Sequence, residues 1–279
     1  MGRVAVSADH LNLLEHPGAA TDNPKRDWLM LGMVLGLRTR QPGAAEPTIV
    51  TFLDAITGIG LSSDSHADAF SPRQVLLAGA DAYDELELQP RTLRENLLVD
   101  FSTARLPRNA VLSVGDDVLL RTTFQCEPCG RLEGHHPGVL KRIGSRRGML
   151  ARVVRGGRIR VGDAIRCSQS SSEPLADAWQ ERILQVLARV PRGRQVEYRH
   201  LAKLAGVPKV YCRVFPKVLA GASADIAARA QAGSVDESRR WMGQELHRRE
   251  DEAALRELAQ IRGDGDRPSS IGRMPCQTK

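Results

Sequence analysis

The sequence has few aromatic side chains and no long apolar run. Phe, Trp and Tyr together make up 4% of the 279 residues, so Leu, Val, Ile and Ala must fill most of the core. No run of about eighteen apolar residues occurs, which argues against a membrane-spanning helix. The opening segment, MGRVAVSADHLNLLEHPG, lacks the continuous apolar stretch of a secretion signal. We therefore expect a cytoplasmic protein without membrane contact.

Cysteine is scarce as well. Five cysteines are an odd number, in a chain too long to need disulfides for its stability, so we expect free thiols. Cys167, Cys212 and Cys276 are isolated in the sequence, whereas Cys126 and Cys129 form a C-x-x-C pair. This pair is the strongest local sign of chemistry in the chain.

Positive charge is concentrated in two segments. The net charge is +7, but residues 131–160 contain nine Lys or Arg and one Glu. Residues 180–220 contain nine Lys or Arg and two Glu. The rest of the chain is acidic overall. This pattern predicts two separate anion-facing surfaces, although two solvated basic faces would give the same composition.

Short apolar runs separated by turn residues occupy residues 30–168. This pattern predicts a β-barrel or a β-sandwich, with one helix in SPRQVLLAGADAYDELEL, residues 71–88. A Gly115-Asp116 turn predicts a β-hairpin, and Gly156-Gly157 predicts a second tight hairpin. Residues 1–29 are predicted to be an N-terminal arm, and residues 264–279 a disordered tail.

After a polar linker at residues 169–175, apolar residues recur with the spacing of an α-helix. Residues 176–222 predict helix, short strand, helix, turn and helix, which is the outline of a winged helix-turn-helix. Residues 223–263 predict further helices, including a long charged one from Asp236 to Ile261. The predicted fold class is α+β multidomain, with a β-barrel followed by a small α-helical domain.

Four motifs in residues 30–166 resemble those of the MOSC family and occur in the family's order. They are GLSSDSHADAFSPRQVLL, LRENLLVD, FQCEPCGRLE and RRGMLARVVRGGRIRVGD. The matching positions are Asp64, His66, Arg73, Gln74, Glu95, Asn96, Cys126, Pro128, Cys129, Arg131, Gly148, Arg152, Gly157, Val161 and Asp163. The sequence departs from the family at Ser63 and Arg94, where Gly is common, and at Ser65, where Arg is often found.

The resemblance implies a MOSC-like β-barrel that handles molybdenum cofactor or activated sulfur. It implies Cys129 as the sulfur- or metal-binding residue, Cys126 as its neighbour, and His66 with Asp64 as a proton donor and its orienting group. A thiolate is a soft ligand that suits molybdenum or a persulfide, and nearby cations favour it. The candidate residues for cofactor binding are Arg73, Gln74, Glu95, Asn96, Arg131, Arg147 and Arg152. At family level, pyridoxal phosphate binding and sulfur-carrier activity are also implied.

Simpler interpretations stay open for the same residues. A C-x-x-C can hold structural thiols or a redox couple. Cys126, Cys129, His135 and His136 could bind zinc, although adjacent histidines rarely both turn inward. Without the family context, His66 would be a loop histidine, and Glu95 with Asn96 would tie loops together.

Residues 175–221 resemble the DNA-binding half of alkylguanine-DNA alkyltransferases and alkyltransferase-like proteins. The matching positions are Trp179-Gln180, Pro191, Gly193, Tyr198, Leu201-Ala202, Ala205-Gly206 and Pro208. The resemblance implies DNA binding, with Tyr198 near a phosphate and with Arg194, Lys209, Arg213 and Lys217 as candidate phosphate contacts. No Pro-Cys-His-Arg acceptor motif follows, and Cys212 replaces the arginine that fills the gap in the base stack. A protein-interaction module is the alternative.

Three functions follow from these patterns. We favour a MOSC-domain protein that binds molybdenum cofactor or activated sulfur through a cysteine and reduces N-hydroxylated bases or related small molecules. In that case the C-terminal module would bring the barrel to DNA or to damaged nucleotides. The alternative is a non-catalytic, alkyltransferase-like protein that recognises damaged bases in DNA. The third is a thiol-redox or zinc-stabilised structural protein.

Overall fold

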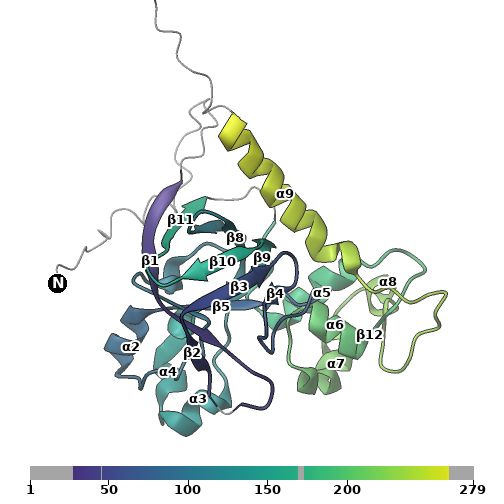
Figure 1. Ribbon diagram of the computed structural model, residues 1–279. Helices are drawn as coiled ribbons and strands as arrows, with labels where there is room; N and C mark the ends of the chain where they lie inside the picture. The colour runs from purple at the N-terminus through teal and green to yellow at the C-terminus, as the bar shows by residue number, and fades with distance from the viewer. Residues whose placement is uncertain (1–27, 45, 169–172, 264–279) are drawn as a thin grey trace, which may run out of the picture.

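The computed structural model describes residues 28–44, 46–168 and 173–263 (Figure 1). The predicted disordered tail and all but the last two residues of the predicted arm lie outside this range. No helix in the described part of the chain is long and apolar enough to cross a membrane. The strands of the first half are β1 (Leu29–Thr39), β2 (Thr48–Val50), β3 (Phe52–Ile56), β4 (Gly60–Leu61), β5 (Val75–Gly79), β6 (Leu97–Val99), β7 (Val111–Val114), β8 (Val118–Gln125), β9 (Met149–Arg155), β10 (Gly157–Arg160) and β11 (Ala164–Ser168).

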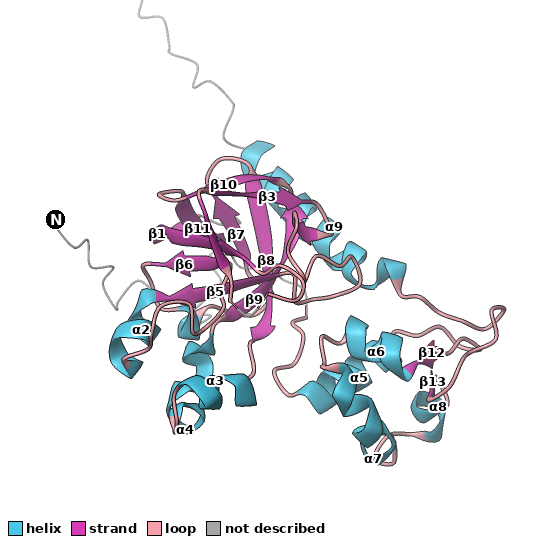
Figure 2. Cartoon of the chain, turned by 60° about the horizontal axis from the view of Figure 1, so that its bottom comes forward, coloured by secondary structure: helices cyan, strands magenta, loops and turns pink. Residues whose placement is uncertain are grey.

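Seven of these strands close into a barrel. Their order is β11-β7-β8-β9-β5-β6-β1, and β1 pairs back onto β11, so the sheet has no free edge there (Figure 2). Strand β2 continues the sheet from the far end of β1. The interior is filled by aliphatic side chains such as Leu77, Leu97 and Leu120, as the shortage of aromatics predicted. The predicted barrel is therefore confirmed.

One of the two predicted hairpins is confirmed and the other is wrong. Strands β7 and β8 pair across the Gly115-Asp116 turn, where Gly115 has a φ of +58°. Strand β10, however, pairs with β3 in a separate three-stranded sheet instead of folding back on β9. At Gly156 an added Cβ would lie 2.5 Å from the carbonyl oxygen of Ala55. The two glycines therefore allow the chain to pass close to β3. A glycine pair in a sequence can indicate such a close contact as well as a tight turn.

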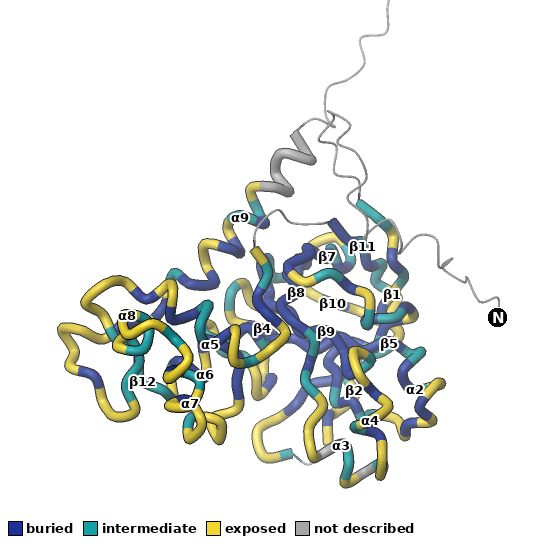
Figure 3. The backbone as a smooth tube through the Cα atoms, turned by 180° about the vertical axis from the view of Figure 1, so that it is seen from behind, coloured by how far each residue is buried: buried dark blue, intermediate teal, exposed yellow. Residues whose placement is uncertain are grey.

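The helix predicted over residues 71–88 is only half correct. Val75–Gly79 forms strand β5, which is buried along its whole length between β9 and β6 (Figure 3), and only Ala80–Leu86 forms helix α2. A strand buried on both faces has no polar–apolar alternation, so its sequence cannot be distinguished from a buried helix. The remaining short helices of this half are η1 (Thr103–Arg105), α3 (Gly130–His135), α4 (Val139–Ile143) and η2 (Gly144–Arg147).

The C-terminal module, residues 173–243, contains the predicted order of elements. It is made of α5 (Trp179–Ala188), β12 (Val196–Glu197), α6 (Tyr198–Leu204), η3 (Lys209–Val214), α7 (Phe215–Leu219), α8 (Ala224–Ala227) and β13 (Ala230–Gln231). In place of one third helix the chain forms the 3-10 segment η3 and then α7, whose start contains Pro216. Strands β12 and β13 pair in parallel. Whether this module is a winged helix stays a prediction.

The long C-terminal helix joins the two halves of the molecule. Helix α9 (Gln244–Gly263) begins later than the predicted Asp236, because Gly243 directly before it has a φ of +64°, which a right-handed helix cannot include. From there α9 crosses to strands β8 and β9 of the barrel (Figure 1). Asp251 receives hydrogen bonds from Arg121 and Arg152 of the barrel at 2.9 and 3.1 Å. Glu250 pairs with Arg121 and with Arg189 of α5.

This buried ionic cluster is expected to make stability depend on acid pH. Burial alone would raise the pKa of Glu250, but His247, Arg121 and Arg189 outweigh it and lower that pKa to about 2. An unfolded chain with an ordinary carboxyl then binds more protons below about pH 5, so the free energy of unfolding should fall as the pH drops towards about 2. Urea unfolding at several pH values would measure this slope. Glu250→Gln should flatten it, and an unchanged slope would contradict the assignment.

Candidate functional site

The two cysteines of the C-x-x-C motif lie beside one cavity between the barrel and the C-terminal module. Cys126 follows the end of β8 and is buried, and Cys129 precedes α3 and is exposed. The cavity has a volume of about 210 Å³. Its lining comes from both halves of the protein and consists of Arg73, Cys126, Glu127, Pro128, Cys129, Arg147, Trp179, Val207, Pro208 and Tyr211.

Glu127 holds the cysteine loop from two sides. Its carboxylate pairs with Arg73 of the barrel at 2.7 Å and with Arg182 of α5. Burial raises the pKa of Glu127, but the two guanidinium groups outweigh it and keep that pKa below its usual value. Arg73 also donates a hydrogen bond to the sulfur of Cys126, with 3.5 Å between Nη2 and Sγ. A positive charge therefore lies directly against the inner thiol.

Arg182 connects this loop to the C-terminal module. Its side chain is fully buried, and its guanidinium lies 3.6 Å from the centre of the Phe124 ring. It donates hydrogen bonds to three backbone carbonyls, those of Ala176, Asp177 and Ala205. The next residue, Gly206, has a φ of +63°, and an added Cβ would lie 2.8 Å from both Phe124 and Pro72. The junction is therefore tightly packed.

Arg147 brings a second positive charge to the cavity. This residue is buried, and its Nη1 donates a hydrogen bond to the carbonyl oxygen of Leu93 at 2.7 Å. Its Nε has no hydrogen-bond partner, and no described acidic residue pairs with it. A buried guanidinium with a free donor favours a negatively charged occupant nearby.

Three of the predicted polar residues form a buried network that does not line the cavity. Asp64 accepts hydrogen bonds from the side chains of Arg40 and Asn96 at 3.0 and 2.8 Å. Burial raises the pKa of Asp64, but His66 and Arg40 outweigh it, so that pKa lies well below its usual value. Gln74 ties the backbone of Gly58 to that of Val153. These contacts are those expected of residues that fix loops.

The other predicted residues also lie away from the cavity. Glu95 is fully buried, where it pairs with Arg38 and accepts a hydrogen bond from Tyr83 at 2.7 Å. Arg152 belongs to the α9 cluster through Asp251. The hydrogen bond between His66 and Asp64 raises the pKa of this 44% exposed imidazole, but partial desolvation and nearby Arg40 outweigh it, so that pKa lies below its usual value. The side chain of Arg131 lies outside the described part. The structure therefore gathers Cys126, Cys129, Arg73 and Arg147.

The described residues also bear on the zinc alternative. His136 accepts a hydrogen bond from the backbone of Gln89 at 3.3 Å, and the side chain of His135 is outside the described part. Within residues 28–44, 46–168 and 173–263, no group of three or more His, Cys, Asp or Glu side chains could hold a metal ion.

Comparison with known proteins identifies the barrel. Residues 63–166 match the family model of the MOSC domain. This part of the chain is a MOSC domain. Among curated proteins none matches the chain.

Solved structures with a similar arrangement share little sequence with this chain. YuaD from Bacillus subtilis is 17% identical, with a TM-score of 0.46, and the match covers 52% of this chain and 100% of YuaD. YiiM from Escherichia coli is 18% identical, with a TM-score of 0.41 and coverage of 71% and 98%. YiiM from Geobacillus stearothermophilus is 14% identical, with a TM-score of 0.41 and coverage of 69% and 99%.

Two departures from the MOSC pattern fall on unusual backbone positions. Ser63 and Arg94, which stand where the family commonly has Gly, have φ values of +61° and +53°. The left-handed conformation costs a residue with a Cβ roughly 1–2 kcal/mol. The glycine preference of the family at these two loops therefore has a backbone reason, and this chain keeps the conformation without the glycine.

Sequence reasoning missed half of the cavity. Trp179, Val207, Pro208 and Tyr211 come from the C-terminal module, and no local pattern connects them with the cysteines. Glu127 had a usable signal, because it is the only acid between the two cysteines and precedes a strongly basic segment. Residues outside the part that matches the family thus complete the lining of the cavity.

The residues predicted to contact nucleic acid are spread over the C-terminal module. The ring of Tyr198 packs edge-on against Phe215, with centroids 5.4 Å apart. Arg194 donates a hydrogen bond to the carbonyl oxygen of Ser238. Lys209 is exposed, and Arg213 with Lys217 lines a groove together with Trp179. DNA binding by this module stays a prediction.

Proposed function

We propose that the MOSC domain binds molybdenum cofactor or an activated sulfur atom through Cys129. The observation that carries the proposal is the cavity that Cys126 and Cys129 share with Arg73 and Arg147. Cys129 is the exposed thiol, so a ligand can reach its sulfur, whereas Cys126 is buried under Arg73. The lining thus combines a soft ligand with two positive charges.

The lining residues suit a cofactor that binds a thiolate through its metal or sulfur atom and that also carries a negatively charged group. A thiolate suits molybdenum or sulfur better than it suits hard cations such as magnesium. Arg147, with its free Nε, would pair with a negatively charged group of the ligand. When bound, the group would supply two-electron redox chemistry or a transferable sulfur atom. Among its described lining residues the cavity has no lysine, so it offers no Schiff-base partner for pyridoxal phosphate.

The candidate reaction is the reduction of an N-hydroxylated base or a related compound. This conversion takes two electrons from an external reductant and two protons, and it turns N–OH into N–H and water. Trp179 and Tyr211 would hold a flat substrate beside the thiols, because aromatic faces stack on planar rings. Arg73 and Glu127 would keep the cysteine loop in place during turnover.

Molybdenum content tests this proposal directly. Protein made in cells that synthesise the cofactor is expected to retain molybdenum through gel filtration, and Cys129→Ser is expected to lose it. Cys212→Ser is the matched control, because Cys212 contacts the backbone of Tyr198 and does not line the cavity. For the sulfur version, mass spectrometry should find a persulfide on Cys129. Equal molybdenum in wild type and Cys129→Ser, with no persulfide, would contradict the proposal.

A further inference from the structure

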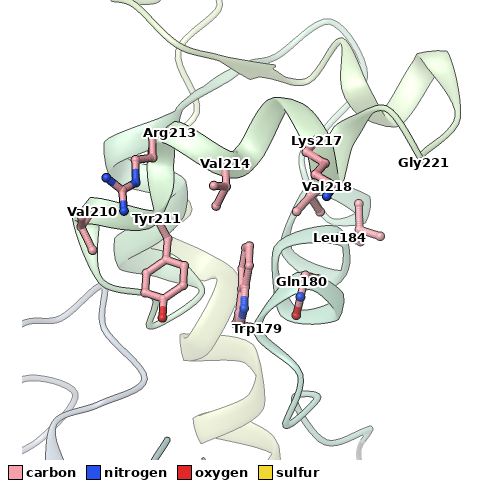
Figure 4. Close-up of a pocket in the computed structure, with 10 residues that line it drawn as sticks. All are labelled: Trp179, Gln180, Leu184, Val210, Tyr211, Arg213, Val214, Lys217, Val218 and Gly221. Carbon is pink, nitrogen blue, oxygen red and sulfur yellow. The ribbon is translucent and has the colours of Figure 1, made fainter. Parts of the chain in front are cut away.

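A second, larger recess lies on the C-terminal module, next to the thiol cavity. Its volume is about 720 Å³ (Figure 4). One side comes from the start of α5, with Trp179, Gln180 and Leu184, and the other from η3 and α7. The second side is made of Val210, Tyr211, Arg213, Val214, Lys217, Val218 and, just after α7, Gly221. Binding sites for small molecules usually measure about 300–1,000 Å³, so the groove can hold one.

The floor of the groove is aromatic and apolar. The rings of Trp179 and Tyr211 lie beside one another, with centroids 5.1 Å apart and planes tilted by 58° (Figure 4). Segment η3 buries none of its residues, and Val210 and Tyr211 are 59% and 39% exposed. Two aromatic faces and several valines at a concave surface favour a planar apolar ligand.

The rim of the groove is positively charged and uncompensated. Arg213 and Lys217 are exposed and project from the η3–α7 side (Figure 4). Neither makes a hydrogen bond or an ion pair with a described residue, and no acidic side chain is among the described lining. Two unpaired cations beside an apolar floor favour a ligand that carries an anionic group.

We infer that this groove binds a small aromatic anion. The planar ring packs against Trp179 and Tyr211, and the phosphate or carboxylate pairs with Arg213 or Lys217, which lie on either side of Val214 at the rim (Figure 4). Arg194, another cation of the predicted DNA surface, donates a hydrogen bond to the carbonyl oxygen of Ser238 and does not line the groove. Tyr198 packs against Phe215 outside the groove. Arg213 and Lys217 are the only cations among the described residues that line the groove, so the groove suits one anionic group better than a run of phosphates.

The groove and the thiol cavity share a wall. Trp179 and Tyr211 line both recesses, so a ligand in the groove lies against the side chains that close the cavity. The inference does not need molybdenum or a reactive thiol, because it rests on the groove alone. Binding can therefore be measured on the full-length protein without any cofactor.

Matched charged and neutral ligands test the inference. Isothermal titration calorimetry is carried out with adenosine 5′-monophosphate against adenosine, and with 1-naphthyl phosphate against 1-naphthol. We expect saturable binding of the two phosphates and roughly tenfold weaker binding of their neutral counterparts, which is the loss of one charge-assisted contact. Quenching of tryptophan fluorescence should accompany binding, because Trp179 is the one of the three tryptophans that lines the groove. Binding of neither phosphate, or equal binding of charged and neutral partners, would overturn the inference.

Variants and a competing ligand locate the site. Arg213→Gln combined with Lys217→Gln should weaken binding of the phosphates about tenfold or more. Arg192→Gln is the control, because Arg192 is an exposed cation of the same module outside the groove. An equal loss in the control would overturn the inference. So would tighter binding of a short DNA duplex that depends on Arg213 and Lys217, since the groove would then belong to a nucleic-acid surface.

Discussion

Replacing Asp251 with Asn should lower the free energy of unfolding by about 3–5 kcal/mol, the usual effect of removing one partner from a buried ion pair. Asp251 is 7% exposed and neutralises two barrel arginines, Arg121 and Arg152, which are 1% and 2% exposed. Asparagine has the same shape but no charge, so Arg152 would lose its carboxylate partner and Arg121 would keep only the carboxylate of Glu250. Urea unfolding followed by circular dichroism measures the change.

The control for this prediction lies one residue further along the same helix. Glu252 pairs with Arg248 at 3.6 Å, and the two side chains are 49% and 69% exposed. Glu252→Gln removes the same charge from α9 but should change stability by about 0.5 kcal/mol or less, because water screens the pair. If Asp251→Asn were as mild as Glu252→Gln, the buried cluster would not be what holds α9 on the barrel.

Replacing Arg182 with Met should lower the free energy of unfolding by about 3–5 kcal/mol, because each buried carbonyl left without its donor costs about 1–3 kcal/mol, and it should loosen the cysteine loop. The apolar part of the side chain would still pack on Phe124, but the backbone carbonyls of Ala176, Asp177 and Ala205 would lose a buried donor. Glu127 would keep only Arg73. Because Glu127 follows Cys126 directly, we expect faster alkylation of the Cys126 thiol by iodoacetamide as well as a lower urea midpoint.

Glu181→Gln on the same helix is the matched control for Arg182→Met. Glu181 is exposed and makes no ion pair with a described residue, so both stability and alkylation should stay near wild type. If Arg182→Met lowered stability without changing the alkylation rate of Cys126, Arg182 would support the module but would not position the loop.

The barrel was predictable because its signals are local. Short apolar runs between turn residues indicate strands, and the four MOSC motifs lie in or beside β5, β6, β8 and β9. The errors occurred where two structures share one local pattern. Val75–Gly79 is apolar at every position, like a buried helix, and Gly156-Gly157 permits either a turn or a close approach between strands.

The site was only partly predictable. Cys126 and Cys129 stand out through their spacing, and Arg73 and Arg147 line the same cavity. Asp64, Glu95 and Asn96 carry the same signal in the sequence but face inward, where they bind backbone and arginine side chains. A polar residue in a motif can bind the ligand, or it can hold the ligand-binding loop in place through hydrogen bonds. The two roles differ only in which way the side chain points.

The amino-acid order alone determined that the first half would be a β-barrel and that a thiol pair would follow its β8 strand, since both depend on neighbours along the chain. The tertiary structure alone decided what surrounds the thiols. Arg73 contacts Glu127, 54 residues later, and the carbonyl oxygen of Gly206, 133 residues later. The contact with Glu127 exists only once the barrel has folded, and the contact with Gly206 only once the C-terminal module has packed against it, because distant segments supply these partners.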